Sequence, residues 1–251
     1  MLLAIDLGNT AIKVAHEDAF GVMRVFRSNL GERPIGDLIG SALDGASKSP
    51  FGAICAVASV APQYDPDVAD ALSVYDLVPK FLNADNAPGI EIKYETPETL
   101  GADRIANALF ASDQYEGSAV VVDFGTATKL DAVNFGGAFV GGAILPGLKM
   151  MVQSLAKGTA KLPEIDLVAP ESAIGKSTRA GLQSGTILAL ARAVEGLLAE
   201  FRLELGEAPM VVGTGGLAEI MAPLCPSIGP VEPNLTLEGL LIAARRWASS
   251  D

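Results

Sequence analysis

Two short turns each combine a carboxylate, a glycine and a hydroxyl in a way that suits phosphate binding. Asp6-Leu7-Gly8-Asn9-Thr10 follows the apolar run 2–5, and Asp123-Phe124-Gly125-Thr126 follows the apolar run 119–122. Such a turn at a strand end offers backbone N–H groups and a hydroxyl to phosphate oxygens, while its carboxylate can hold a metal ion. One copy would be ordinary turn chemistry. Two copies, one in each half, indicate a duplicated fold with a nucleotide held between the halves.

Two further glycine-containing segments have features of phosphate sites. Gly213-Thr214-Gly215-Gly216 lies between a predicted strand and a predicted helix, so its backbone can approach a ring or a phosphate, as in an adenosine site. Gly175-Lys176-Ser177-Thr178 resembles the end of a P-loop, but Pro170 stands where that motif requires glycine and no strand precedes it. We reject a P-loop and expect Thr178 to be a helix cap or a ligand contact.

A polar cluster precedes a predicted helix in the first half. Tyr94-Glu95-Thr96-Pro97 is followed by Gly101-Ala102-Asp103-Arg104. Asp103 could accept the proton of an attacking hydroxyl during phosphoryl transfer. It could equally stabilise the helix dipole, with Arg104 on the surface. The residues alone leave both interpretations open.

The elements that position these turns repeat in order. The first half predicts strands over 2–7, 11–15, 22–28, 51–60 and 77–82 and helices over 35–43, 67–75 and 101–112. The second half predicts strands over 119–122, 129–134, 138–144 and 210–212 and helices over 146–156, 182–203, 217–221 and 236–247. The pattern predicts an α/β protein of two similar lobes, 1–115 and 116–251, each a mixed β-sheet with flanking helices.

Composition excludes several classes of protein. The 251 residues are 49% hydrophobic and 19% charged, and their formal charge of −12 argues against a nucleic-acid binder. Cys55 and Cys225 lie in different halves, so we expect two small core residues and no disulfide framework. His16 is the sole histidine and is expected at an exposed strand end, which leaves proton transfer to a carboxylate.

No segment has the character of a membrane anchor or a signal peptide. The N-terminal apolar run lacks a basic region and reaches Asp6 after five residues. No apolar run approaches the roughly 20 residues that a bilayer-spanning helix needs. The sequence therefore predicts a cytoplasmic protein that binds neither nucleic acid nor membrane.

Taken together, the motifs resemble those of type III pantothenate kinases, members of the acetate kinase–sugar kinase–Hsc70–actin superfamily. The resemblance extends from residue 1 to about residue 246, and the order of its motifs is more specific than any one of them. Besides the turns above it includes Lys13, Ala127-Thr128, Gly141-Gly142-Ala143-Ile144-Leu145-Pro146-Gly147, Thr159-Ala160-Lys161-Leu162-Pro163 and Leu235-Thr236-Leu237-Glu238-Gly239-Leu240. It implies two ribonuclease-H-like (actin-like ATPase) lobes.

The resemblance also implies an activity and its residues. The activity is ATP-dependent phosphorylation of pantothenate to 4′-phosphopantothenate, the first step of coenzyme A biosynthesis, with Asp103 as general base. ATP would be bound by Asp6, Leu7, Gly8, Asn9, Thr10, Ala11, Ile12, Lys13, Thr126 and Gly215. Pantothenate would be bound by Tyr94, Gly101, Ala102, Asp103, Arg104 and Thr178, the last from the partner subunit of a homodimer.

Two cations belong to the same expectation. Asp123 would hold a monovalent cation, K⁺ or NH₄⁺, and Mg²⁺ would accompany ATP with Asp6 as the nearest carboxylate. This chain has Lys129 where the family usually has a further threonine after Thr128. That lysine could add charge to the nucleotide site and partly replace the cation, or it could point to solvent.

Two other functions fit the same fold, because fold does not fix function. A non-catalytic nucleotide-binding regulator is disfavoured, since Asp6, Asp103 and Asp123 are all present. Another small phosphotransferase of the superfamily, or an actin-like ATPase, would leave the segment 101–104 without a role. The kinase remains the preferred hypothesis.

Overall fold

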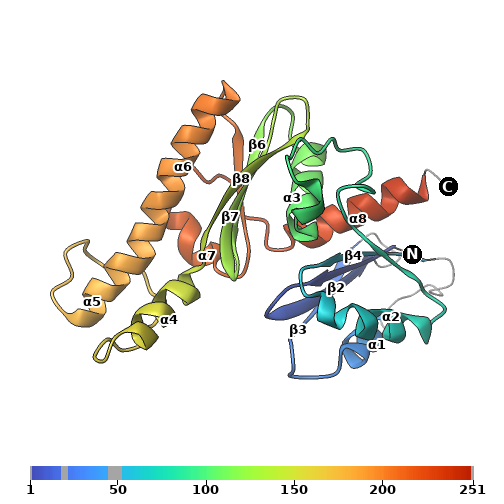
Figure 1. Cartoon of the computed structure of the whole chain (residues 1–251), viewed down its shortest axis with the longest axis horizontal. Helices are drawn as coiled ribbons and strands as arrows, with labels where there is room; N and C mark the ends of the chain where they lie inside the picture. Colours follow the sequence, from blue (N-terminus) through green and yellow to red (C-terminus); the bar gives the residue numbers. More distant parts are fainter. Residues whose placement is uncertain (1, 18–21, 45–52, 250–251) are drawn as a thin grey trace. The chain divides into compact units, whose positions relative to one another are not determined.

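The computed structural model describes residues 2–17, 22–44 and 53–249, and it forms two compact units (Figure 1). One unit comprises Met1–Gln114 with Leu235–Asp251, and the other comprises Tyr115–Asn234. Each unit contains one mixed sheet with flanking helices, as the sequence predicts.

The first unit is built on a five-stranded sheet in the order β3-β2-β1-β4-β5. Its first three strands form an antiparallel meander, while β4 and β5 run parallel to β1. The strands are β1 (Leu2–Leu7), β2 (Ala11–Glu17), β3 (Met23–Asn29), β4 (Ile54–Ser59) and β5 (Pro79–Phe81). The helices are α1 (Ile35–Asp44), α2 (Asp65–Ser73), α3 (Ala102–Gln114) and α8 (Leu235–Ala248), with short 3-10 turns at Pro62–Tyr64 and Pro97–Thr99.

The two faces of this sheet are packed by different helices. Alternate residues of β1, among them Leu3, Ile5 and Leu7, join the core formed with α1 and α2. The intervening Ala4 pairs with Ala15 on one side and Ala56 on the other, and all three are buried. Helix α8 packs on β1 and β4, where this row of small side chains lets a helix approach closely.

Helix α8 corrects the predicted domain boundary. The sequence assigned it to the lobe 116–251, whereas it packs against α3 and β1 and belongs to the first unit. The reason is the apolar content of α8, which has buried residues around most of its circumference, including Leu237, Leu240 and Ala243. Such a helix needs apolar partners on several sides. Those partners lie in the first unit although α8 is the last element of the chain.

The second unit repeats the arrangement with four strands in the order β8-β7-β6-β9. An antiparallel meander of β6, β7 and β8 is extended by β9, which runs parallel to β6. The strands are β6 (Ala119–Phe124), β7 (Ala127–Val133), β8 (Phe139–Pro146) and β9 (Met210–Thr214). The helices are α4 (Leu148–Gly158), α5 (Thr178–Gln183), α6 (Ala189–Leu205) and α7 (Ala218–Met221), with a π turn at Ser184–Leu188 and a 3-10 turn at Ala222–Leu224.

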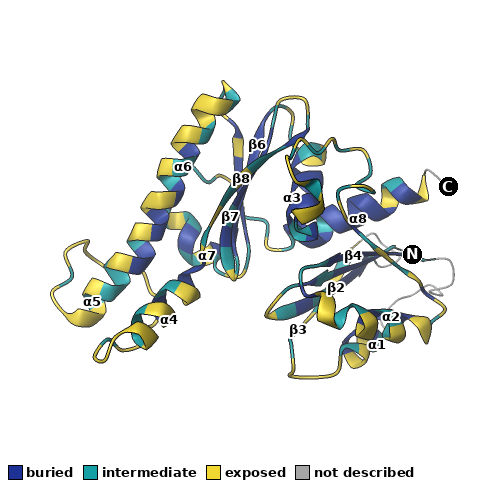
Figure 2. Cartoon of the chain, viewed as in Figure 1, coloured by how far each residue is buried: buried dark blue, intermediate teal, exposed yellow. Residues whose placement is uncertain are grey.

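The predicted helix over 182–203 is longer and less regular than expected. The helical segment begins at Thr178, passes through the π turn Ser184–Leu188 and continues as α6. Within the π turn the Ser184 hydroxyl donates a hydrogen bond to the carbonyl of Ala173 (2.6 Å). This tertiary contact cannot be predicted from the helical spacing of apolar residues in the sequence. Figure 2 shows the buried and exposed sides of α6, whose Leu190, Val194 and Leu198 enter the core.

His16 is buried, so its predicted exposure is wrong. Strand β2 continues to Glu17, and alternation places His16 on the same face as the core residues Ile12 and Val14. The imidazole is 0% exposed and stacks on Phe26 with ring centroids 6.0 Å apart. Neither ring nitrogen has a hydrogen-bond partner among the described residues. The expectation that His16 has no catalytic role is not tested by this burial.

Part of one predicted element lies outside the described residues, namely positions 51–52 of the strand expected over 51–60. Within the described ranges, no helix is long and apolar enough to cross a membrane.

Both cysteines are buried free thiols, as the sequence predicts. Burial raises the pKa of the Cys55 thiol far above its usual range. Burial, followed by the Glu195 carboxylate, raises the pKa of Cys225 to about 11, while Arg192 acts in the opposite direction. At pH 8 Cys225 would then be thiolate in about one molecule in 10³.

We expect neither thiol of the folded protein to react with a disulfide reagent at pH 8 within minutes, and both to react at once in denaturant. Counting the released chromophore per chain checks this. Rapid labelling of one thiol under native conditions would contradict the burial of that cysteine.

Candidate active site

The first predicted phosphate turn joins β1 to β2. Gly8 donates its N–H to the carbonyl of Ala11 (3.0 Å), which closes the turn and leaves Asn9 and Thr10 exposed. Leu7 and Ile12 are buried at 0% and 2% exposure, so only their backbone could face a ligand. The turn can therefore present backbone N–H groups and the Thr10 hydroxyl, as a phosphate cradle does.

Asp6 and Lys13 face each other across the two strands that this turn connects. They are register partners, and Lys13 Nζ lies 3.4 Å from Asp6 Oδ2. Both side chains are largely covered, at 22% exposure for Lys13 and 16% for Asp6. The turn thus carries one carboxylate and one ammonium close together.

The polar cluster before α3 adjoins the same turn. Val60 donates its N–H to the carbonyl of Leu7 (3.0 Å), directly after β4. A side chain at Gly101 would meet Val60 Cγ1 at 3.6 Å and Asp103 Oδ1 at 2.6 Å. The first unit therefore brings the predicted phosphate turn and the predicted catalytic carboxylate together, with Val60 between them. Val60 is not among the residues that the sequence predicts for this site, because it is apolar and has no chemical signature of its own.

The first turn of α3 fixes two of the predicted residues. Asp103 Oδ1 accepts the backbone N–H of Arg104 (2.9 Å), which holds the carboxylate at the start of the helix. Arg104 is only 5% exposed, and its guanidinium carbon lies 5.9 Å from the centre of the Tyr94 ring. The alternative that placed Arg104 on the surface is therefore wrong. Ala102 is buried and can offer only backbone atoms, whereas Tyr94 is half-buried.

The second predicted turn lies at the carboxyl end of β6 in the other unit. Asp123 is 8% exposed, and its Oδ2 lies 2.9 Å from Lys129 Nζ. Thr126 is an exposed residue in the turn between β6 and β7. The alternative in which Lys129 points to solvent is wrong, because its side chain is only 15% exposed.

Gly215 brings the third glycine segment against this turn. Strands β6 and β9 are parallel neighbours with Asp123 opposite Thr214, so their carboxyl ends meet. Gly215 has φ +93°, and a side chain there would overlap Asp123 Oδ1 and lie 2.7 Å from the Phe124 carbonyl carbon. Only glycine fits both the positive φ angle and the short distance between this backbone and residues 123–124. The second unit therefore unites the Asp123 turn with the predicted adenosine segment.

Thr178 is the first residue of α5 and is exposed. It is not the cap of that helix, since the Ser177 hydroxyl accepts the N–H of Ala180 at the N-cap position. The helix-cap alternative for Thr178 is therefore wrong. Its hydroxyl is accessible to a ligand or to another chain.

The chain offers one candidate carboxylate for a divalent ion at the first turn, Asp6. No group of three or more His, Cys, Asp or Glu side chains that could hold a metal ion occurs within the described ranges. A single carboxylate fits Mg²⁺ that arrives with a nucleotide, because Mg²⁺ commonly takes one or two carboxylates together with phosphate oxygens and waters.

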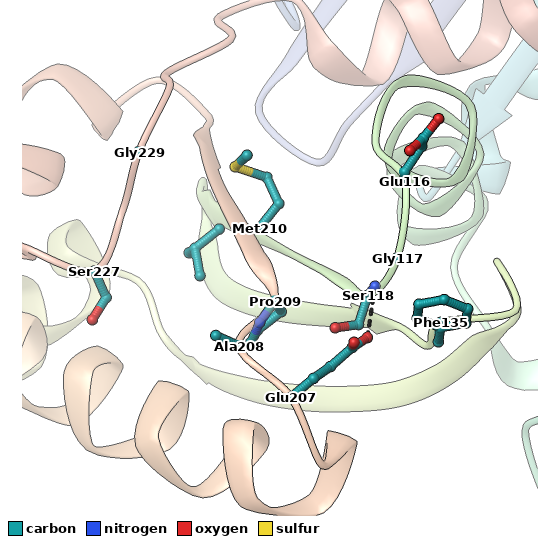
Figure 3. A pocket seen from close by; sticks show the side chains of 11 residues that line it. Glu116, Gly117, Ser118, Phe135, Glu207, Ala208, Pro209, Met210, Ser227 and Gly229 are labelled. Atoms are coloured by element: carbon teal, nitrogen blue, oxygen red, sulfur yellow. Dashed lines mark hydrogen bonds between the residues drawn. The ribbon is translucent and has the colours of Figure 1, made fainter.

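A hollow of about 530 Å³ lies elsewhere in the second unit (Figure 3). It is lined from the amino ends of β6 and β9, by Ser118 and Met210, and by Phe135 and Glu207. The Ser118 N–H donates to Glu207 Oε1 (3.0 Å), which is drawn as a dashed line in Figure 3. The hollow contains none of the predicted site residues. Asp123, Thr126 and Gly215 lie at or just beyond the opposite, carboxyl ends of these strands.

A family profile and the similar proteins of known sequence all indicate the same family. Residues 2–200 match the sequence profile of the type III pantothenate kinases. The type III pantothenate kinase of Thermomicrobium roseum is 37% identical over 256 residues, covering 100% of this chain and 99% of that protein. The type III pantothenate kinase of Roseiflexus sp. strain RS-1 is 39% identical over 246 residues, covering 96% of each.

The fold is shared with a wider group of kinases. The crystal structure of the ROK hexokinase from Thermus thermophilus matches with a TM-score of 0.52, covering 100% of this chain and 99% of that one. At 13% identity this likeness shows the fold alone. It confirms the expected α/β fold of two ribonuclease-H-like lobes.

Proposed function

Because this chain belongs to the type III pantothenate kinase family, we propose that it transfers the γ-phosphoryl group of ATP to the 4′-hydroxyl of pantothenate, the first step of coenzyme A biosynthesis. The observation that carries the proposal is the adjacency of the Asp6–Thr10 turn and Asp103, joined through Val60 and Gly101. Phosphoryl transfer needs a phosphate cradle beside a group that can accept a proton, and this unit provides both.

The residues of the first turn bind and orient ATP. Backbone N–H groups of the turn and the Thr10 hydroxyl hold phosphate oxygens, and Lys13 adds positive charge beside them. Asp6 is the protein carboxylate that would hold the Mg²⁺ of ATP, and that ion would neutralise phosphate charge. Thr126 and Gly215 are further residues that we propose for ATP binding.

Asp103 receives the proton. The hydroxyl oxygen of pantothenate forms a bond to the γ-phosphorus while the bond from that phosphorus to the β–γ bridging oxygen breaks. The hydroxyl proton passes to the Asp103 carboxylate, and ADP leaves. The short distance between a Gly101 side-chain position and Asp103 Oδ1, 2.6 Å, supports glycine as a requirement for this carboxylate position.

Arg104 and Tyr94 orient the substrate. A largely buried guanidinium suits the carboxylate of pantothenate, because charge-assisted hydrogen bonds from arginine are strong and directional. The Tyr94 ring lies against that guanidinium and holds it in place. Gly101 and Ala102 leave room for the pantothenate chain. We further propose a homodimer in which the exposed Thr178 of one subunit reaches the pantothenate of its partner.

A direct assay tests the proposal. Purified protein with Mg-ATP and pantothenate should release one ADP for each 4′-phosphopantothenate formed, with both products followed by mass spectrometry. A pantothenate analogue that lacks the 4′-hydroxyl serves as the control and should give no phosphorylated product. If ADP is released at the same rate with and without pantothenate, the protein is an ATPase and the kinase proposal is wrong. If the protein binds ATP but does not hydrolyse or transfer its phosphate, a regulatory function is favoured.

A further inference from the structure

The ammonium group of Lys129 lies beside Asp123, the carboxylate at which the family resemblance places a monovalent cation. Lys129 Nζ lies 2.9 Å from Asp123 Oδ2, within hydrogen-bond distance. The two side chains are only 15% and 12% exposed, so water screens the pair far less than it would a surface pair. Lys129 and Asp123 are also register partners on β7 and β6, which fixes them opposite each other.

The same arrangement occurs in the first unit. Asp6 on β1 is the register partner of Lys13 on β2, and their charged groups are 3.4 Å apart. In both units the aspartate lies on the first strand of the meander, directly before the glycine turn, and the lysine lies on the second strand. Each unit therefore has one Asp–Lys pair at the same place in its meander, and Lys129 belongs to the second of these pairs.

A second carboxylate, that of Asp131, adds negative charge to the same strand. Asp131 is two residues beyond Lys129 on β7, so strand alternation places both on one face, and Asp131 is 0% exposed. Burying a carboxylate is costly unless positive charge or hydrogen bonds compensate it. The ammonium of Lys129 supplies positive charge on that face, where it pairs with Asp123.

The residues do not fit a K⁺ ion at the same oxygen of Asp123. An ion there would stand against the Lys129 ammonium, and two like charges a few ångströms apart repel strongly where solvent is scarce. NH₄⁺ and the lysine head group are alike in charge and hydrogen-bond donors. The side chain can therefore supply what the free ion would.

We propose that Lys129 is the built-in monovalent cation of this site. Its ammonium fills the position beside Asp123, supports the nucleotide turn 123–126 and makes phosphoryl transfer independent of added K⁺ or NH₄⁺. The statement about transfer rests on the proposed kinase function. The statement about occupancy rests on the Asp123–Lys129 pair alone.

The native protein gives the first test. Pantothenate phosphorylation is measured in K⁺, NH₄⁺, Na⁺ and tetramethylammonium chlorides at equal ionic strength. We expect rates that agree within about twofold across the four salts, since no site selects among them. A rate that collapses in tetramethylammonium and returns with K⁺ would overturn the proposal while leaving the kinase function intact.

The variant Lys129→Thr gives the converse result. Without K⁺ its rate should fall by about 10²-fold, the loss typical of removing one preorganised charge contact, and added K⁺ should restore most of it. Lys157→Thr, an exposed lysine at the end of α4, is the matched control and should behave like the native protein in all salts. A Lys129→Thr enzyme that is equally active with and without K⁺ would also overturn the proposal.

Thermal unfolding supplies a readout that does not depend on turnover. In the presence of ATP, K⁺ in place of tetramethylammonium should leave the Tm of the native protein unchanged and raise that of Lys129→Thr. If no salt supports pantothenate phosphorylation, the kinase function fails, and this Tm comparison alone decides the occupancy of the site. A Tm of the native protein that rises with K⁺ would show a cation site that Lys129 does not fill.

Discussion

Replacing Asp103 by asparagine is expected to lower kcat for pantothenate phosphorylation by about 10³-fold, within the range attributed to general-base catalysis. Asparagine keeps the size of the side chain and can still accept the Arg104 N–H, which Asp103 Oδ1 accepts at 2.9 Å. It cannot take a proton from the attacking hydroxyl. The loss should therefore appear in kcat, with little change in the affinity for ATP.

The alternative role of Asp103, stabilisation of the α3 dipole, predicts a different outcome. Loss of a helix N-terminal charge costs about 0.3–1 kcal/mol of stability and no specific activity. Glu98→Gln is the matched control, because Glu98 is an exposed acid in the turn before α3. Its kcat should stay within about twofold of native, as expected for a surface change. A kcat for Asp103→Asn within tenfold of native would assign Asp103 to helix stability alone.

The strand plan and its turns could be predicted because they depend on local sequence. Apolar runs that end in Asp and Gly mark β1 and β6, and the meanders that follow them appear at the expected places. The contact between the Asp6 turn and Gly101 could not be predicted from the sequence, because it is made through Val60. Contacts between segments so far apart in sequence depend on packing that no local pattern records.

The errors have the same origin. His16 lies where β2 continues to Glu17, two residues beyond the predicted strand, which turns an expected strand end into a buried position. The charge of Lys129 was visible, but its partner follows from the β6–β7 register. That register could have been inferred from the first unit, because Asp6 and Lys13 show the same order around a turn of similar length. Helix α8 was misassigned because sequence position is a poor guide to packing partners.

The misassigned helix also carries a glycine at which a single methyl group should strongly lower stability. At Gly239, helix α8 passes very close to α3. A side chain at this position would overlap the carbonyl oxygen of Ala106 and lie 2.6 Å from the Ala106 carbonyl carbon. Both atoms are backbone, so no rotamer change can relieve the clash. Gly239→Ala must separate the two helices and disturb the contacts of Leu235 and Leu240. We expect a loss of about 3 kcal/mol, the upper part of the range for overpacking.

The sole tryptophan gives a local probe of this unit. Trp247 lies on α8, is 5% exposed and donates its indole N–H to the Asn86 carbonyl (3.1 Å). Its fluorescence during urea or thermal unfolding reports the first unit, where Gly239→Ala should lower the Tm by about 10 °C. Circular dichroism follows the whole chain.

Gly196→Ala separates this clash from the ordinary effect of glycine in a helix. Gly196 lies within α6 with open space where its side chain would be, so alanine there should stabilise by about 0.5–1 kcal/mol through helix propensity. The same substitution thus has opposite signs at two helical glycines, and only the distance to the neighbouring backbone differs. A Gly239→Ala protein as stable as native would mean that α3 and α8 do not cross at Ala106. The packing of α8 on the first unit would then need revision.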